Sequence, residues 1–432
     1  MAKKEEKYQW RIGFPPPDID RHSLTKHTII EEYVRRYVLT LMKPANIPEL
    51  KLTIVDGFCG GGCYLTEDNE LTDGSPLLVM RAVRESRAEL NLTRNNPRTI
   101  NVDYHFVDIS PDTTAYLKNF LQAKLDESKI DKEDFDRTNV VTSSFFEQLP
   151  SIVQKIKQRK GGEHALFLLD QYCYKDIPLP QIKGILANLK SAEVLMTFGV
   201  DNLTTYLADR AANRKPINEI GLDKYIPWQD IKLLKATHKR EWRQILQKYL
   251  ADGIKKETCA DNMTLFFVKP FGDNTWSYWL IHLSNNYRAH DVMKTLHWKH
   301  STEFAHELEP GHFLLGYDAN HDFSYTGQET FEFGSEASKE SCVSGVAEHL
   351  GEVLFKLNQP VMVRDLFKQV ITNTTANEAL LMDSLRLDHQ SKKVIVTSKD
   401  NKLKRINKAY QLSDVIEPSK QTSIYFCFPD EN

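Results

Sequence analysis

Apolar residues recur with two different spacings in the first part of the chain. Between Thr25 and Met42 they return every three or four residues, which predicts an amphipathic helix with one buried face. Short apolar runs rich in β-branched and aromatic residues follow it, at 52–55, 104–107, 140–141, 165–169 and 193–198. Helix-like segments such as 113–126 and 179–189 lie between these runs. Because such runs are typical of strands buried on both faces of a parallel sheet, the pattern predicts an α/β fold with an open, doubly wound sheet.

Two further apolar runs, at 263–268 and 276–283, are separated by a short polar turn at 269–274. Because a parallel crossover needs a dozen or more residues, these two strands must form an antiparallel hairpin. Five parallel strands closed by such a hairpin are the order expected of a methyltransferase-type Rossmann sheet. We therefore predict a Rossmann-like domain over residues 25–300, preceded by an extended surface arm over 1–24 that contains three consecutive prolines.

The last third of the chain differs in composition and in its pattern of apolar residues. Residues 301–342 are rich in Gly, Asp and Ser and are expected to form an irregular connection. Three short helical segments follow, at 346–357, 362–371 and 377–388, and a basic hairpin-like stretch comes next at 393–404. Three short helices and a basic hairpin predict a winged-helix-like C-terminal domain over residues 343–432.

Composition narrows the functional classes. The 432 residues carry 56 Lys and Arg against 59 Asp and Glu, a net charge of −3, which excludes a polycation as a whole but leaves room for a local basic patch. No apolar stretch approaches the roughly 20 residues that span a bilayer, and the start lacks the apolar core of a secretory signal. Six cysteines without a Cys-x-x-Cys pair favour neither a disulfide scaffold nor a zinc site. The histidines between 297 and 321 lack acidic or Cys partners at ligand spacing, so we expect no metal site and a soluble cytoplasmic protein.

The clearest chemical signal is the glycine-rich sequence Asp56-Gly-Phe-Cys-Gly-Gly-Gly62, directly after the first predicted strand. Open α/β sheets bind ligands at the carboxyl ends of their strands. Gly60 and Gly62 would let the backbone approach a nucleoside, with Phe58 beside it, and Asp56 would accept hydrogen bonds from a cationic amino group. The alternative is a tight strand-to-helix turn without a ligand, in which Cys59 and Cys63 serve as small packing residues.

Two further acids follow predicted strands. Asp108 ends the second strand, where an acidic residue is the usual partner of ribose hydroxyls. Its distance in sequence from the glycine loop is much larger than the customary spacing of about 20 residues. The excess is explained if Ser75, as N-cap, begins an additional helix. The alternative for Asp108 is the N-cap of the following helix.

Asp170, Gln171 and Tyr172 follow the fourth strand. Enzymes that methylate amino groups hold an acid or amide there to accept the target N–H bonds, and an aromatic ring that stacks on the base. The two prolines that accompany these residues in such enzymes are missing. The location is therefore that of an active site, and the type of reaction stays open.

Basic residues gather in two stretches of this otherwise acidic chain. The segment 392–408 holds seven basic residues against one acid, and its candidate phosphate contacts are Lys392, Lys393, Lys402, Lys404 and Arg405. The helical segment 232–248 adds six more, with Trp242 among them. Either stretch alone is explained by a solvated charged face, but the two together favour contact with nucleic acid, either DNA or RNA.

Several of these segments together resemble one family. The resemblance covers about residues 22–300 and is carried, in order, by Thr25-Lys26-His27, Val55-Asp-Gly-Phe-Cys-Gly-Gly-Gly-Cys-Tyr64, Asp73-Gly-Ser-Pro-Leu77, Phe106-Val-Asp108, Leu169-Asp-Gln-Tyr-Cys-Tyr174 and Tyr278-Trp-Leu-Ile-His-Leu283. In order and spacing these resemble the three-Cys-motif partner proteins of bacteria and archaea. That family usually shows Asp-x-Phe-Ala-Gly-x-Gly, then Gly-Ser-Pro, then Asp-Pro or Asp-Gln followed by an aromatic residue and Gly.

The resemblance implies an S-adenosylmethionine-binding Rossmann-like fold, encoded beside a small or radical-type protein with three cysteines. It places Asp56, Phe58, Gly60 and Gly62 in the nucleoside loop, Asp108 at the ribose and Asp170 in the active site. Cys59 stands where the family usually has Ala, and Cys173 stands where it has Gly. The second departure puts a larger side chain into the expected pocket.

Three functions follow from these residues. The first is an S-adenosylmethionine-dependent methyltransferase that acts on nucleic acid together with a three-cysteine partner protein. The second is a catalytically inactive protein that binds nucleic acid or docks a partner through its winged helix, which the missing prolines favour. The third is a metal-dependent nuclease using Asp56, Asp108 and Asp170, ranked last because no Lys stands near those acids in the sequence.

Overall fold

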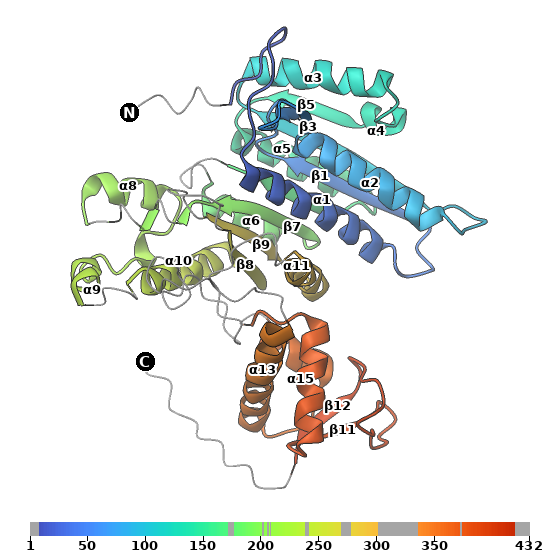
Figure 1. Ribbon diagram of the computed structural model, residues 1–432, viewed down its shortest axis with the longest axis vertical. Helices are drawn as coiled ribbons and strands as arrows, with labels where there is room; N and C mark the ends of the chain where they lie inside the picture. Colours follow the sequence, from blue (N-terminus) through green and yellow to red (C-terminus); the bar gives the residue numbers. More distant parts are fainter. Residues whose placement is uncertain are drawn as a thin grey trace. The chain divides into compact units, whose positions relative to one another are not determined.

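The structure is a computed structural model that describes residues 8–171, 177–200, 203–204, 207, 209–237, 242–268, 278–300, 336–371 and 374–419. The chain divides into two compact units, and the division falls between Leu296 and His297 (Figure 1). We describe each unit by itself.

The first unit is built on a sheet of seven strands in the order β5-β4-β1-β6-β7-β9-β8. The strands are β1 (Glu49–Asp56), β4 (Thr99–Asp108), β5 (Thr138–Thr142), β6 (His164–Leu169), β7 (Ala192–Phe198), β8 (Asn262–Val268) and β9 (Tyr278–Ser284). The first five are parallel, and β9 runs antiparallel to both β7 and β8. The predicted α/β fold, with five parallel strands and an antiparallel hairpin, is confirmed. The predicted turn at 269–274 lies outside the described residues.

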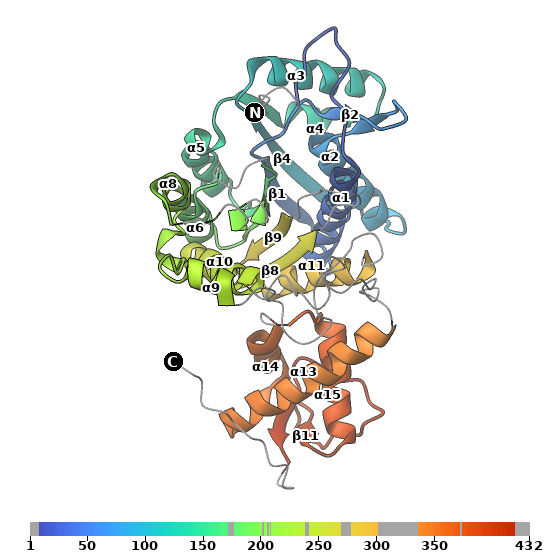
Figure 2. The ribbon, with the colours of Figure 1, turned by 60° about the vertical axis from the view of Figure 1, so that its left-hand side comes forward.

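Helices cover both faces of this sheet (Figure 2). The described α-helices of the unit are α1 (Arg21–Leu41), α2 (Ser75–Asn91), α3 (Pro111–Asp126), α4 (Lys132–Asp136), α5 (Phe145–Gln158), α6 (Leu179–Asn188), α8 (Ala211–Glu219), α9 (Ile231–Thr237), α10 (Trp242–Thr258) and the greater part of α11 (Tyr287–Lys299), and a short 3-10 helix is η3 (Asp223–Tyr225). A short hairpin of β2 (Cys63–Leu65) and β3 (Leu71–Asp73), which the sequence pattern did not predict, lies between β1 and α2.

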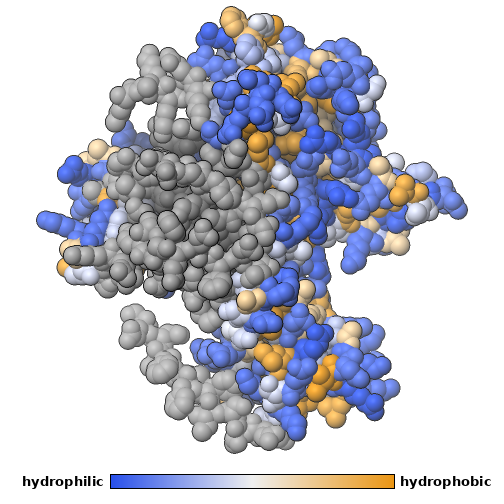
Figure 3. All heavy atoms as spheres, viewed as in Figure 1, coloured by the Kyte–Doolittle hydropathy of each residue, from blue (hydrophilic) through white to orange (hydrophobic). Residues whose placement is uncertain are grey.

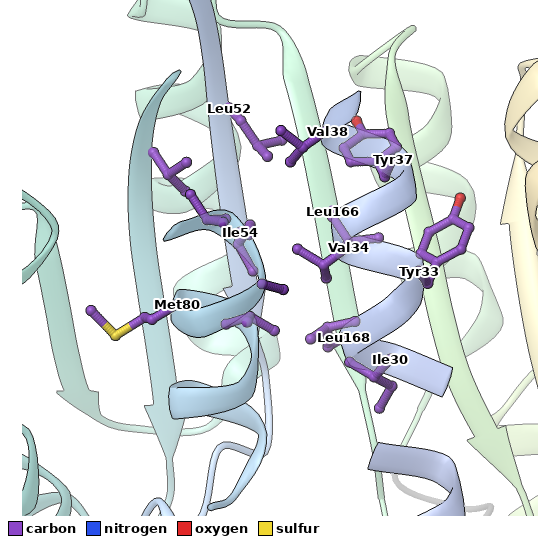
Figure 4. Packing of buried hydrophobic residues seen from close by; sticks show 14 of the residues in the cluster. Ile30, Tyr33, Val34, Tyr37, Val38, Leu52, Ile54, Met80, Leu166 and Leu168 are labelled. Carbon is purple, nitrogen blue, oxygen red and sulfur yellow. The ribbon is translucent and has the colours of Figure 1, made fainter. Parts of the chain in front are cut away.

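The core on one face of the sheet forms between α1 and the central strands. Figure 4 shows Ile30 and Val34 of α1 facing the strands that carry Ile54 and Leu166, and all four side chains are fully or almost fully buried. The helix forms at this place because its apolar residues, three and four positions apart, all point to the sheet. This packing fixes the start of α1 against the carboxyl ends of β1 and β6.

The N-terminal arm differs from the expectation of a segment that only lies on the surface. Trp10 and Ile19 are 5% and 4% exposed. The Ile19 N–H donates to the Leu65 carbonyl at 2.8 Å, and the Leu65 N–H donates to the Pro17 carbonyl at 3.0 Å, so the arm pairs with β2. Helix α1 then begins at Arg21, before the predicted boundary at residue 25. Apolar side chains separated by prolines anchor the arm without forming a regular element.

The described part of the second unit contains α13 (Glu336–Leu357), β10 (Val361–Met362), α14 (Val363–Val370), α15 (Glu378–Gln390), β11 (Val394–Thr397) and β12 (Val415–Pro418). Its strands form a sheet in the order β10-β12-β11. Helix α13 begins ten residues before the predicted start at 346 and ahead of the predicted boundary at 343.

The predicted hairpin-like stretch over 393–404 is present as a short turn. The Ser398 N–H donates to the Lys402 carbonyl at 2.9 Å, the Lys404 N–H donates to the Val396 carbonyl at 2.8 Å, and Thr397 forms a bridge with Leu403. Along its whole length, however, β11 pairs with β12, which the sequence pattern did not predict. Val396 and Ile416 are fully buried in this pairing, whereas Leu403 is 76% exposed. The burial of apolar side chains therefore selects β12 as the partner strand and leaves residues 398–414 as a long loop, here called the wing loop.

Polar residues predominate over scattered apolar ones on the face of the described parts that Figure 3 shows. Among the helices of the described residues, none is long and apolar enough to cross a membrane.

Candidate functional site

The candidate site lies at the carboxyl ends of β1 and β6, which pair side by side. From β1 the sheet continues through β4 to β5 on one side, and from β6 it continues to β7 on the other. The loops that follow β1 and β6 therefore separate at this point. In open α/β sheets such a reversal of strand order leaves a crevice that binds ligands. The structure places Asp56 at the end of β1 and Asp170 directly after β6.

The glycine loop is held to the end of β4 by Asp108. Gly60 and Gly62 have φ angles of 59° and 85°, which favour glycine. The Gly60 N–H donates to Oδ2 of Asp108 at 3.3 Å, and the Ser110 N–H donates to Oδ1 at 2.9 Å. Burial raises the pKa of Asp108, and these two hydrogen bonds partly oppose the rise. Each carboxylate oxygen thus has one backbone partner and can accept a second hydrogen bond.

The space beside these glycines holds side chains of the protein itself. A Cβ atom at Gly60 or Gly61 would lie 2.9 Å or 2.2 Å from the indole of Trp10, and one at Gly62 would lie 2.7 Å from Leu117. The indole N–H of Trp10 donates to the Cys63 carbonyl at 2.7 Å. The indole therefore lies directly against the glycine loop, in space that the sequence reasoning assigned to a nucleoside.

Asp56 holds the loop to α2. Its carboxylate accepts the Phe58 N–H at 3.1 Å and the Ser75 hydroxyl at 2.6 Å, and the residue is 1% exposed. Burial raises its pKa to about 7 in spite of these two hydrogen bonds. The prediction that Ser75 is the N-cap of α2 is wrong, because Gly74 occupies that position and the Ser75 hydroxyl turns to Asp56 instead. The ring of Phe58, half-buried, lies 6.4 Å from that of Phe145 of α5.

Asp170 forms an ion pair with Lys26 of α1, whose side chain is 10% exposed. The Thr197 hydroxyl of β7 donates to Oδ1 of Asp170 at 3.0 Å. Burial acts to raise the pKa of Asp170, but the Lys26 ammonium and these hydrogen bonds outweigh it and bring the pKa below its ordinary value. Asp170 is therefore ionised. Burial and the Lys26 charge lower the pKa of the neighbouring His27 to about 3, so this imidazole is neutral.

Gln171 adds an acceptor beside Asp170. The residue is 9% exposed, and its Nε2 donates to the Thr197 carbonyl at 3.5 Å. Its Oε1 has no hydrogen-bond partner among the residues that the structure describes. Buried side-chain oxygens are usually satisfied, so an N–H of a bound ligand or a water fits this position. Tyr172, the third predicted residue of this group, lies outside the described residues.

The sequence reasoning missed three contributors to this site. Lys26 was part of a motif without a role, and Trp10 and Tyr64 had none. The ring of Tyr64 meets that of Trp10 edge-on at 5.3 Å and lies 5.9 Å from the ring of His27. A tryptophan among polar residues was the available signal, because the burial of Lys26 cannot be read from the sequence. Neither residue indicates its partner, because each partner is distant in the sequence.

The argument that ranked the nuclease hypothesis last does not hold, but the described residues add no support for a metal site. The expectation that no Lys stands near the three acids is wrong, because Lys26 pairs with Asp170. However, within the described part of the chain no three His, Cys, Asp or Glu side chains are placed to hold a metal ion. Asp56 and Asp108 are instead engaged with the glycine loop and its neighbours.

In the second unit the predicted phosphate contacts separate into two groups. Lys392, Lys402 and Arg405 are exposed. Lys393 lies 3.7 Å from Asp388, and Lys404 forms an ion pair with Asp414, which is 1% exposed. The Lys404 ammonium, predicted to contact phosphate, is therefore engaged by a buried acid of the same unit.

The second basic stretch spans α9 and the first part of α10. Its Lys235 ammonium lies 4.6 Å from the ring centre of Trp242, a cation–π contact. Lys239 and Arg240 of this stretch are outside the described residues.

No family model matches the chain, and no curated protein matches it. Among solved structures it is similar to a Legionella pneumophila protein of the DUF519 family, with 11% identity over 64% of this chain and 92% of that one and a TM-score of 0.34. It is also similar to a DUF574 family protein of Streptomyces avermitilis, with 13% identity over 60% of this chain and 83% of that one and a TM-score of 0.28. At these scores neither structure supports an inference about what this chain does.

Proposed function

We propose that the first unit binds S-adenosylmethionine at the carboxyl ends of β1, β4 and β6, and that the protein is a methyltransferase acting on nucleic acid. The observation that carries the proposal is the link between the glycine loop and Asp108 at the reversal of strand order, with Asp170 and Gln171 beside it. The strand order, five parallel strands and a hairpin in which β9 is antiparallel, is the one expected of a methyltransferase-type sheet.

The donors and acceptors of the site suit this ligand in part. Asp108 keeps acceptor capacity for the ribose hydroxyls after binding two backbone N–H groups. Asp56 also accepts two hydrogen bonds from the protein, but it is 1% exposed, so we assign it to holding the loop rather than to touching the ligand. Next to Gly60 and Gly61 the ligand has to lie against the indole of Trp10 or displace it.

The cofactor supplies the methyl group, and the protein orients the acceptor. Asp170 and Gln171 are the groups that accept the N–H bonds of a target amine on an unstacked base. Lys26 keeps Asp170 ionised and fixed in direction. These roles follow from the position of both side chains directly after β6.

Nucleic acid is the proposed substrate because of the second unit. Its order of helix, strand, helix, helix, strand, strand is the one that a winged helix requires, with the wing loop between the last two strands. Lys392, Lys402 and Arg405 are exposed there. The proposal that a small three-cysteine protein is a partner rests on the family resemblance alone.

Isothermal titration with S-adenosylmethionine tests the proposal. Asp108→Ala removes a charged acceptor and should weaken binding about ten- to a hundred-fold. Asp126→Ala, an exposed acid at the end of α3, is the matched control and should bind like the wild type. The proposal fails if the wild type shows no binding, or if Asp108→Ala binds as tightly as the wild type.

The ion pair of Lys26 with Asp170 favours the second candidate, a protein that binds both ligands without chemistry. A carboxylate already satisfied by an ammonium is a weaker acceptor for a target N–H. Transfer of a labelled methyl group to DNA or RNA separates the two. Cofactor binding without transfer supports the inactive protein, and transfer that is lost in Asp170→Ala supports the enzyme.

A further inference from the structure

An open hollow of about 610 Å³ lies in the second unit between the end of α15 and the wing loop. This volume is in the range of sites that bind small molecules or single nucleotides, about 300 to 1,000 Å³. Its lining residues are Arg386, Gln390, Ile406, Asn407, Lys408 and Ala409. Nothing in the predicted winged helix accounted for it.

The rim of the hollow is held in place at both ends. Tyr410, 8% exposed, shares a hydrogen bond of 2.9 Å between its hydroxyl and Nδ1 of His389 on α15. On the other side, buried Asp414 pairs with Lys404 and accepts the Gln411 N–H at 2.7 Å. Residues 405–409 lie between these anchors. Contacts within the protein therefore fix both ends of the segment that lines the hollow.

The chemistry of its lining suits a nucleobase. The carboxamides of Gln390 and Asn407 each offer one acceptor and two donors, which is what the edge of a base requires. Ile406 offers an apolar face, and the Arg386 guanidinium, 5.8 Å from the ring centre of Tyr410, offers a flat cationic one. Lys408 at the rim provides a charge for the adjoining phosphate.

The charge of α15 argues against insertion of this helix into a duplex. Besides the buried Asp388 it carries Glu378 and Asp383 against Arg386, and Arg386 is itself paired with Asp383 at 2.6 Å. The helix therefore offers no net positive charge to the phosphates of a groove. The exposed positive charge lies instead on the wing loop, at Lys399, Lys402, Arg405 and Lys408.

We propose that this hollow binds one unstacked base of single-stranded nucleic acid, with the flanking phosphates on the lysines and arginine of the wing loop. The inference rests on the proposed function and deepens it by naming the strand state of the substrate. It assigns base contact to Gln390 and Asn407 and phosphate contact to Lys402, Arg405 and Lys408.

Fluorescence anisotropy with the full-length protein tests it, using a fluorescein-labelled strand of mixed sequence as DNA and as RNA, and the matching duplexes. We expect at least one single strand to bind more tightly than either duplex. Asn407→Ala and Gln390→Ala should each weaken single-strand binding about three- to ten-fold. The slope of log affinity against log salt should stay unchanged, because carboxamides release no counterions. Gln369→Ala, an exposed carboxamide on α14, is the control and should bind like the wild type.

The other outcomes separate this inference from the function on which it rests. Two results would contradict base binding in the hollow: duplex binding as tight as single-strand binding, or an Asn407→Ala variant that binds normally. Either result would still be compatible with phosphate binding by the wing loop. Absence of binding to every oligonucleotide contradicts both. Displacement of the labelled strand by a poly-glutamate peptide at equal charge concentration overturns the inference in favour of a protein-docking surface.

Discussion

The indole of Trp10 and the glycine loop form one of the tightest contacts of the first unit. Gly61 has an ordinary φ angle, so the backbone there does not require glycine. What requires it is the indole, which lies 2.2 Å from the position of a Cβ atom. The glycine at this position therefore indicates the arm of the chain that covers it, and not only a ligand.

A double-mutant cycle tests this contact. Gly61→Ala should destabilise the first unit because the new methyl group collides with the ring, and the cost should largely disappear in a Trp10→Ala background. We expect a coupling free energy of about 1 to 3 kcal/mol between the two substitutions. Urea unfolding, monitored through the hydrogen exchange of β1 amides, measures it. Additive effects of the two substitutions would show that the indole does not lie against the loop.

Asp56 makes the stability of the first unit depend on pH. Its pKa rises from the ordinary 3.8 to about 7 on folding, so between these values the folded state binds the proton more tightly than the unfolded state. The stability from this group is fully present below pH 3.8 and is lost as the pH rises through about 7. Asp56→Asn should therefore flatten the decline in the free energy of unfolding between pH 4 and 8 by about 1 to 4 kcal/mol. An unchanged decline, measured by hydrogen exchange of β1 amides, would contradict this.

Helix α1 connects elements that are distant in the sequence. Lys26 at its first turns pairs with Asp170 after β6. About two turns further along the helix, the Tyr33 hydroxyl donates to Glu193 of β7 and lies 2.9 Å from Nε2 of His282 of β9. These buried polar contacts add to the apolar packing and set the position of α1 over the sheet.

Loss of the Lys26 charge should leave Asp170 without its ion-pair partner and destabilise the first unit. Lys26→Gln leaves a largely buried carboxylate without its cation, which should cost about 3 kcal/mol of stability at pH 7. The Asp170 pKa is lowered on folding, so the stability that it contributes is present above its ordinary pKa and is lost as the pH falls through the lower folded value. Without the Lys26 charge, burial acts to raise the Asp170 pKa, so in Lys26→Gln this loss on the acid side should shrink or disappear.

The double variant Lys26→Gln with Asp170→Asn removes the charge together with its partner and should recover most of this stability. Hydrogen exchange of β6 amides measures the stability of the wild type, of Lys26→Gln and of the double variant. A single variant as stable as the wild type would mean that the ion pair contributes nothing.

The elements that the sequence predicts correctly are those specified by local burial. The run 165–169 becomes β6 because every residue in it is apolar, and α1 follows from the spacing of its apolar residues. The side-chain partners could not be predicted in the same way. Ser75 is an adequate N-cap by itself, and only the folded position of Asp56 shows that its hydroxyl turns elsewhere.

The candidate site shows the same difference between positions that follow from topology, which could be predicted, and side-chain contacts, which could not. The sequence could place Asp108 and Asp170 at one edge of the sheet because the ends of parallel strands meet there, which is a topological rule. Lys26 and Trp10 could not be placed in this way, since their contacts depend on how the arm and α1 cross that edge. β12 was missed as the main partner of β11, because only the burial of Ile416 in the folded protein marks 415–418 as a strand.

Over the whole molecule, a net charge of −3 contrasts with the basic wing loop. Binding of nucleic acid by such a chain has to be local and dependent on salt. Lys402→Glu and Arg405→Glu each should remove about one phosphate contact and flatten the log–log salt slope by about 0.9 on duplex DNA or 0.7 on single strands.

Lys404 should behave differently from its neighbours. Its ammonium pairs with buried Asp414, so Lys404→Glu should lower the thermal midpoint of the second unit, whereas the substitutions at Lys402 and Arg405 should not. A salt titration and a melting curve of the same three variants check both statements. An unchanged slope for Lys402→Glu and Arg405→Glu on DNA and RNA would make the wing loop a solvated surface.

Hydrogen exchange of the full-length protein with and without S-adenosylmethionine tests the central claim most directly. If the cofactor binds at the reversal of strand order, exchange should slow in the glycine loop (57–62), in the residues after β4 (109–112) and around Trp10, and stay unchanged in the second unit. Protection confined to other segments, or no change at saturating cofactor, would contradict the proposed site.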